Sequence, residues 1–170
     1  MMGRKTLLTV AAMMTLSLIA FAAAKPNFSG TWTMDRARSF GLPGDMNQTL
    51  TIAQTGDKIE LETKLIQPNN ERSVKDTYVL DGKEYDYSPP VPPNQPADKP
   101  APKGKRTAVW LPGDKGIQVT ELVTSEGPKG PVQTQTVRKW TISGEGELVI
   151  DMYIDNPNIS YEAKRIFKKN

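Results

Sequence analysis

Short runs of β-branched and aromatic residues constrain the fold of this chain more than any other feature. From Ser29 onward, Val, Ile, Thr, Tyr and Trp gather in runs that Gly, Pro, Asn and Asp interrupt, and such runs are typical of short β-strands. No helical periodicity is apparent outside the N-terminal segment. The runs predict strands over residues 29–35, 47–54, 57–66, 72–80, 83–87, 105–111, 116–124, 132–142, 147–154 and 159–167. Short strands with frequent turns predict an antiparallel barrel or sandwich, and 170 residues allow one domain.

Turn dipeptides predict how neighbouring strands pair, and this tests the assignment. Directly opposed residues of an antiparallel pair share a face of the sheet. Two-residue loops at Thr55-Gly56, Asp81-Gly82 and Asn156-Pro157 predict the pairs Ile52–Ile59, Leu50–Leu61, Met46–Leu65, Tyr78–Tyr85, Asp76–Tyr87, Ile154–Ile159, Met152–Tyr161 and Ile150–Ala163. Nearly all of these residues are apolar or aromatic, so turns and faces agree. The agreement favours an all-β, antiparallel up-and-down meander barrel of roughly 8–10 strands.

In such a meander, alternate connections lie at the same end. Residues 55–56, 81–82, 112–115 and 143–146 form one set, and all are tight turns. Residues 36–46, 67–71, 88–104, 125–131 and 155–158 form the other set, and most are longer. We therefore expect one closed end and one open end, as in small barrels that hold one ligand.

The N-terminal segment has the pattern of a secretory signal peptide. Arg4 and Lys5 precede an apolar run from Thr6 to Ala24 that ends in a small-x-small cleavage pattern. A membrane anchor is the alternative, because the run is near the lower length limit for a span. We expect residues 1–24 to be cleaved, leaving a single secreted or periplasmic domain over 25–170.

Composition excludes several classes of function. Without Arg4 and Lys5, 20 of the 22 Lys and Arg remain against 19 Asp and Glu, so nothing predicts binding to nucleic acid or to an anionic membrane. The chain has no cysteine and no histidine, which removes disulfides, thiolate chemistry, the commonest general base and the commonest metal ligands. No catalytic motif is present. We expect no enzyme, no cofactor and no metal site.

The start of the first strand carries a family resemblance. "SGTW", with Gly30 and Trp32, resembles the Gly-x-Trp signature of lipocalins, and "FSGTWTMDRARSF" is similar to the opening of intracellular fatty-acid-binding proteins. The chain from 25 to 170 is most similar to secreted bacterial proteins with a lipocalin-like domain. The resemblance implies that Arg165 of the last strand packs over Trp32 at the closed end. Residues 36–46 are too short for the helix pair of fatty-acid-binding proteins, and no C-terminal helix follows the last strand.

Trp32 and Gly30 also have a structural role in their own right. A large ring would fill the barrel floor and bury much area, with Arg165 stacked on it, and Gly30 would permit close backbone approach. We therefore expect Gly30, Trp32 and Arg165 to be structural residues of the closed end.

The predicted register also places polar side chains inside the open end. The loop at 112–115 sets Arg106 opposite Glu121, and the closed end is lined by Ile52, Ile59, Leu80, Trp110, Ile117 and Leu148. The candidate ligand-binding residues of the open end are Gln48, Thr63, Asp76, Tyr78, Tyr85, Tyr87, Arg106, Glu121, Met152 and Tyr161. A polar mouth over an apolar floor is typical of a pocket for an amphipathic molecule. The register of strand 132–142 stays open, because the face shared by Arg138, Trp140 and Ile142 disagrees with the adjoining hairpin; a bulge is one way to reconcile them.

Residues 88–105 are proline-rich, with seven of the 14 prolines of the chain. Such a segment is not a central strand, and we expect a mobile loop over the open end.

Two functions remain open. The preferred one is an exported, monomeric barrel that binds a small, partly apolar molecule. The alternative is a filled barrel that acts as a structural or protein-interaction module. An internal cavity above about 300 Å³ would favour ligand binding.

Overall fold

The structure is a computed structural model and describes residues 24–41, 44–68, 70–91, 100–127 and 130–170. Each predicted strand corresponds to an observed one, in the order β1 Gly30–Met34, β2 Asn47–Thr55, β3 Lys58–Gln67, β4 Asn70–Val79, β5 Tyr85–Tyr87, β6 Lys103–Trp110, β7 Ile117–Gly127, β8 Gly130–Ile142, β9 Leu148–Asn156 and β10 Ile159–Lys169. Two short 3-10 turns, η1 Arg36–Arg38 and η2 Pro112–Asp114, are the only helical elements among the described residues. The predicted signal peptide lies outside the described residues, apart from Ala24. No described helix is long and apolar enough to span a membrane.

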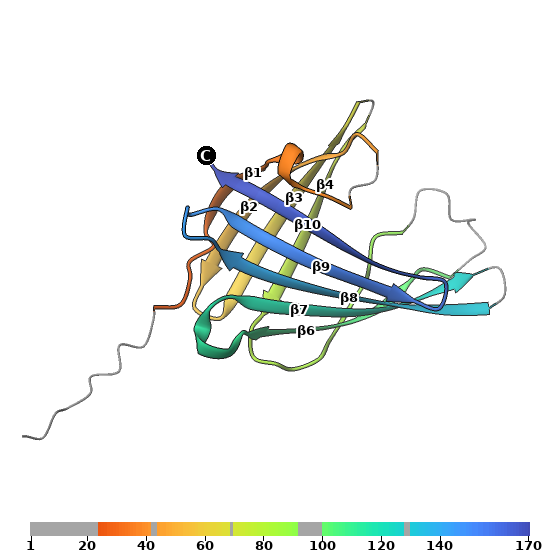
Figure 1. Ribbon diagram of the computed structural model, residues 1–170. Coiled ribbons are helices and arrows are strands. Elements are labelled where there is room, and N and C mark those ends of the chain that lie inside the picture. The colour runs from red at the N-terminus through yellow and green to blue at the C-terminus, as the bar shows by residue number, and fades with distance from the viewer. Residues whose placement is uncertain (1–23, 42–43, 69, 92–99, 128–129) are drawn as a thin grey trace, which may run out of the picture.

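The strands form one antiparallel sheet in the order β4-β3-β2-β1-β10-β9-β8-β7-β6-β5. Consecutive strands are neighbours everywhere except between β4 and β5, and β10 pairs with β1. The sheet curls into a half-barrel, with β1 to β4 forming one wall and β6 to β10 the other (Figure 1). The predicted all-β up-and-down meander is confirmed.

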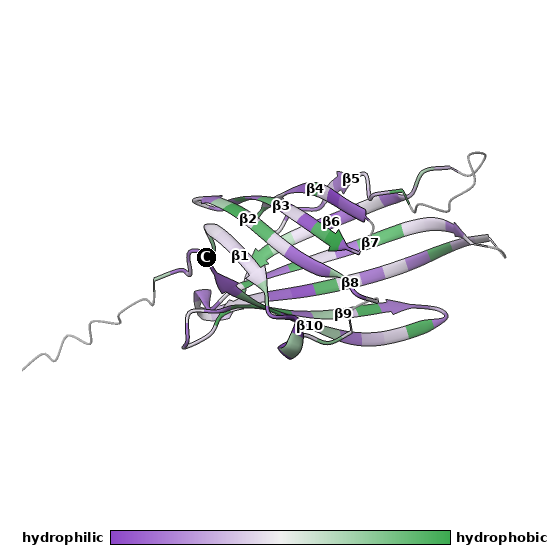
Figure 2. Ribbon diagram, turned by 90° about the horizontal axis from the view of Figure 1, so that it is seen from above, coloured by the Kyte–Doolittle hydropathy of each residue, from purple (hydrophilic) through white to green (hydrophobic). Residues whose placement is uncertain are grey.

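The two-residue period of the strands produces the core. Hydrophobic and hydrophilic residues alternate along the strands (Figure 2), and the inward set is buried. Trp32, Trp140, Phe28 and Phe167 are the largest fully buried side chains. Each fully buried large apolar side chain contributes about 1.5–3 kcal/mol, so this inner face holds the curl together.

Two hairpins keep their predicted faces but not their predicted partners. Thr55 pairs with Lys58, so the loop is 56–57, and Asn156 pairs with Ile159, so the loop is 157–158. Asn156 Oδ1 accepts the N–H groups of Asn158 and Ile159, which ends the strand at Asn156. Both registers therefore shift by two residues. Such a shift keeps every side chain on its face.

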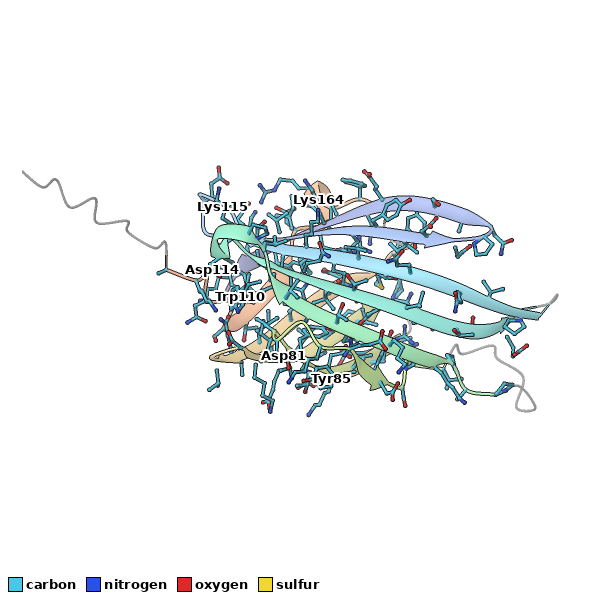
Figure 3. All side chains as sticks on the ribbon, turned by 90° about the horizontal axis from the view of Figure 1, so that it is seen from below. Asp81, Tyr85, Trp110, Asp114, Lys115 and Lys164 are labelled. Atoms are coloured by element: carbon cyan, nitrogen blue, oxygen red, sulfur yellow. The ribbon has the colours of Figure 1, made fainter. Side chains whose placement is uncertain are left out.

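The predicted hairpin at Asp81-Gly82 is wrong. Residues 80–84 connect β4 and β5, which lie at opposite edges of the sheet, so the pairs Tyr78–Tyr85 and Asp76–Tyr87 do not form. Asp81 instead makes a local turn, because Oδ1 accepts the Lys83 N–H and Oδ2 accepts the Tyr85 hydroxyl. Gly82 N–H donates to the Ala108 carbonyl, which directs the chain to β6. Figure 3 shows Asp81 and Tyr85 close together on this part of the molecule.

The connections of the open end are shorter than predicted. β3 and β4 are separated by two residues, as are β7 and β8, because the strands continue into segments that the sequence predicts to be loops. The connections 35–46 and 88–102 alone are long. β8 needs no bulge, because Trp140 pairs with both Ile117 and Ile150 on the inner face.

The described ends of the proline-rich segment belong to the fold. β6 begins at Lys103, inside the predicted loop, and Pro102 is buried. Pro90 lines the interior cavity. Residues 92–99, the centre of the predicted loop, lie outside the described residues.

Candidate functional site

The half-barrel holds a partly open cavity of about 240 Å³. Its walls combine apolar side chains, among them Leu50, Leu61, Ile150, Met152 and Phe167, with the charged side chains Asp76, Arg106, Glu121, Arg138 and Arg165. The cavity is below the roughly 300–1,000 Å³ of sites for drug-sized ligands. An occupant must therefore be small, or extend beyond the cavity.

Most of the predicted site residues meet in this cavity. Gln48, Thr63, Asp76, Tyr78, Tyr87, Arg106, Glu121 and Met152 line it. Tyr85 lies outside it, 42% exposed, with its hydroxyl on Asp81. Tyr161 also lies outside it, 43% exposed, because the register shift sets Ala163 opposite Met152.

A buried ion-pair network lines one side of the cavity. The predicted Arg106–Glu121 pair is confirmed, with Arg106 Nε donating to Glu121 Oε1 at 2.8 Å. Arg106 Nη2 donates to Asp76 Oδ1 at 2.7 Å, and Arg138 Nη1 donates to Glu121 Oε2 at 2.6 Å. Burial acts to raise the pKa of Glu121, but the charges of Arg138 and Arg106 outweigh it and hold the pKa below its usual value. Glu121 therefore stays ionised and neutralises its neighbours.

Aromatic rings pack against this network. The Arg106 guanidinium lies 4.0 Å from the centroid of the Tyr87 ring and 4.8 Å from that of Tyr78. Tyr78 packs edge-on against Trp140, and burial raises the pKa of Tyr78 well above its usual value. Both tyrosines are neutral at physiological pH.

Arg165 is buried without a carboxylate partner among the described residues. It is 6% exposed and lines the cavity. Its Nη1 donates to the Phe40 carbonyl at 2.9 Å, and Nη2 donates to the Gly41 carbonyl at 3.4 Å, while Nε has no partner among the described residues. Burial lowers the pKa of Arg165 below its usual value. The resemblance did not imply this interior position.

Trp140 has a second buried donor without a partner among the described residues, and its side chain lines the same cavity. Its ring is 1% exposed, and its Nε1–H has no hydrogen-bond partner. Trp140 pairs with Ile150, and Ile150 pairs with Arg165, so the two donors flank Ile150 in one inward row. Adjacent strands are about 4.8 Å apart, so the backbones of Trp140 and Arg165 are about 10 Å apart across Ile150.

The closed end differs from the lipocalin pattern in its cation. Trp32 is buried and its Nε1 donates to the Phe28 carbonyl at 2.8 Å. The cation over its ring is Lys169, with Nζ 5.3 Å from the centroid, and no contact joins Trp32 to Arg165 among those of the described residues. Gly30, with φ +135°, leaves room for the Lys169 side chain, since a Cβ there would lie 2.6 Å from Lys169 Cε. The expectation for Arg165 is therefore wrong, because Lys169 is the residue paired with Trp32.

Sequence comparison identifies no relative: no family model and no curated protein matches the chain. Comparison with solved structures gives a shared fold. The REP1-NXSQ fatty acid transporter superposes with a TM-score of 0.51 at 13% identity, covering 84% of this chain and 95% of that one. Apo lipid binding protein 8 of Caenorhabditis elegans superposes with a TM-score of 0.52 at 12% identity, with the same coverage of 84% and 95%. The chain has a fold of the lipocalin and fatty-acid-binding-protein kind.

Proposed function

We propose that this protein binds a small amphipathic anion inside the half-barrel, with the anionic group at Arg165. The observation that carries the proposal is a buried guanidinium with a free Nε–H and no carboxylate partner among the described residues. A buried charge without a counter-charge is costly. An anion in the cavity would remove that cost.

The charges of the cavity support the same conclusion. Among the described residues that line the cavity, Arg106, Arg138 and Arg165 face two acids, Asp76 and Glu121. Both acids bind Arg106 or Arg138, so one positive charge is left over at Arg165. The free Trp140 Nε1–H provides a second donor for an anionic oxygen.

The apolar side chains of the cavity suit the remainder of such a ligand. Leu50, Leu61 and Phe167 form an apolar wall, and pockets of this composition orient molecules with one polar group. The two solved structures with the same fold are named a fatty acid transporter and a lipid binding protein. Their names support a carrier role here.

A filled, ligand-free barrel is the second candidate, and the cavity volume favours it. The cavity of about 240 Å³ falls short of the volume that would by itself indicate ligand binding. In this alternative, Arg165 serves only to anchor residues 40–41. The two candidates make opposite predictions for binding.

Binding of octanoate and of octanol to the protein over residues 25–170 separates these candidates. We expect octanoate to bind at least about tenfold more tightly than octanol, as about 1.4 kcal/mol for one charge-assisted interaction implies. Arg165→Gln removes the preference in the same titration. Arg36→Gln is the matched control, because Arg36 also anchors loop carbonyls, at Met46 and Gly44, without lining the cavity.

Trp140→Phe tests the second donor. Loss of one hydrogen bond, about 0.5–1.5 kcal/mol, weakens octanoate binding while octanol binding changes little. Equal affinity for octanoate and octanol contradicts the assignment of Arg165, and absence of binding by either supports the filled barrel.

We also propose that the protein is exported, with residues 1–24 removed. The support is the charged and apolar N-terminal segment and its cleavage pattern. N-terminal sequencing of protein secreted by a bacterial host is expected to begin at Lys25. Retention of residues 1–24 contradicts cleavage.

A further inference from the structure

The sheet has one break in its hydrogen bonding, between its edge strands β4 and β5. The curl brings β4 beside β6, the partner of β5. Across this break, Arg106 Nη2 donates to Asp76 Oδ1 at 2.7 Å, and Nη1 donates to the Thr77 carbonyl at 3.5 Å. A side chain therefore bridges the place where a barrel would have a backbone ladder. We call the region between β4 and the strands β5 and β6 the seam.

Two cavities meet at the seam. The interior cavity lies on one side, and a cavity of about 220 Å³ lies on the other. Thr77 and Asp86, both exposed, line the second cavity. Tyr78, Tyr87 and Arg106 line both cavities. These three side chains are the wall between the two cavities.

This wall is held by contacts that side-chain rotation alone can release. When Arg106 separates from Asp76, it keeps its hydrogen bond to Glu121. Opening of the wall therefore leaves no buried guanidinium without a partner. The Asp76 side chain is 23% exposed and gains water when it is released. The Tyr87 ring rests on Gly104, where a Cβ would lie within 2.7 Å of three ring carbons. Burial raises the pKa of Tyr87 to about 12, so its hydroxyl stays neutral.

We propose that small molecules pass between solvent and the interior cavity through the seam, with Tyr87 and the Arg106–Asp76 pair as the gate. The proposal rests on the proposed function, because it requires an interior ligand. Ligand binding at Arg165 gives the ion-pair network of Arg106, Asp76 and Glu121 no role. The gate gives it one. Side-chain rotations of this kind are fast compared with strand separation.

A cross-link across the seam tests the gate, since the chain has no cysteine of its own. Thr77→Cys with Asp86→Cys, joined by a cleavable two-armed maleimide linker, ties β4 to β5 on the outer side. Neither residue lines the interior cavity. The control is Asp155→Cys with Ser160→Cys, which links two residues that are already paired in β9 and β10.

The probe is anilinonaphthalene sulfonate, an amphipathic anion whose fluorescence rises in apolar sites, followed by stopped flow. We expect the seam cross-link to slow association and dissociation together by about tenfold or more, a barrier increase of about 1.4 kcal/mol, with the equilibrium affinity nearly unchanged. Cleavage of the linker restores both rates. The control cross-link changes neither.

Gly104→Ala gives an independent test, because the added methyl group displaces the Tyr87 ring while every charged side chain of the cavity remains. We expect faster association, which a loss of ligand contacts does not produce.

Rates that are unchanged in the seam cross-link, with the probe still bound, overturn the gate alone. Absence of binding by both octanoate and the probe in every variant overturns the proposed function and the gate with it.

Discussion

Replacement of Glu121 by glutamine measures what the ion-pair network contributes to stability. The Glu121 side chain is 7% exposed and accepts hydrogen bonds from Arg106 at 2.8 Å and Arg138 at 2.6 Å. Glutamine keeps the shape but removes the charge, so two charge-assisted bonds of about 1.5–3 kcal/mol each are weakened. We expect Glu121→Gln to lower the free energy of unfolding by about 3–5 kcal/mol, as for a broken buried pair.

The members of the network are expected to differ in how much they contribute to the free energy of unfolding. Asp76 contacts Arg106 alone among the arginines and is 23% exposed, so Asp76→Asn is expected to lower the free energy of unfolding by only about 1–2 kcal/mol. Arg138 has Glu121 as its one carboxylate partner among the described residues. Glu121→Leu with Arg138→Met removes both charges together, and its cost should be smaller than the sum of the single changes by about 1–3 kcal/mol.

Urea unfolding followed by tryptophan fluorescence gives these free energies, because Trp140 lies beside the network. The slope of the unfolding free energy against urea must match that of the wild type for the values to be comparable. A loss below about 1 kcal/mol for Glu121→Gln, or strict additivity in the double variant, would refute the claim that this network is buried and coupled.

The remaining predictions concern the closed end and pH. Trp32→Ala should cost about 3–5 kcal/mol, because the deleted ring leaves a cavity. The losses of unfolding free energy should be non-additive when Trp32→Ala is combined with Lys169→Ala, and additive when it is combined with Arg165→Ala. The opposite pattern in urea unfolding would show that Arg165, and not Lys169, contacts Trp32. The pKa of Glu121 is depressed, so its contribution to the unfolding free energy is present above the ordinary value of 4.5 and is lost as the pH falls through the lower folded value. Glu121→Gln should flatten that acid slope, and an unchanged slope would assign it to another carboxyl group. With no histidine in the chain, stability should vary little between about pH 6 and 8.

Local sequence determined the strands and their faces. Alternating runs between turn residues predict the inward and outward sets, because a strand has a side-chain period of two. That period also explains why two hairpins had the right faces with the wrong partners: a shift of two residues at 56–57 or 157–158 leaves each face intact. Arg106 and Glu121 were paired correctly because the loop at 112–115 fixes their register.

Contacts between distant segments were decided only by the tertiary structure. Asp81-Gly82 has the composition of a hairpin turn, yet its hydrogen bonds to Lys83, Tyr85 and Ala108 send the chain across the seam. The sequence could not show that Lys169, and not Arg165, lies beside Trp32. The register between β10 and β1 decides which residue does. The turns set the spacing along the chain, but the curl of the whole sheet decides which edges meet and which charge is left without a partner.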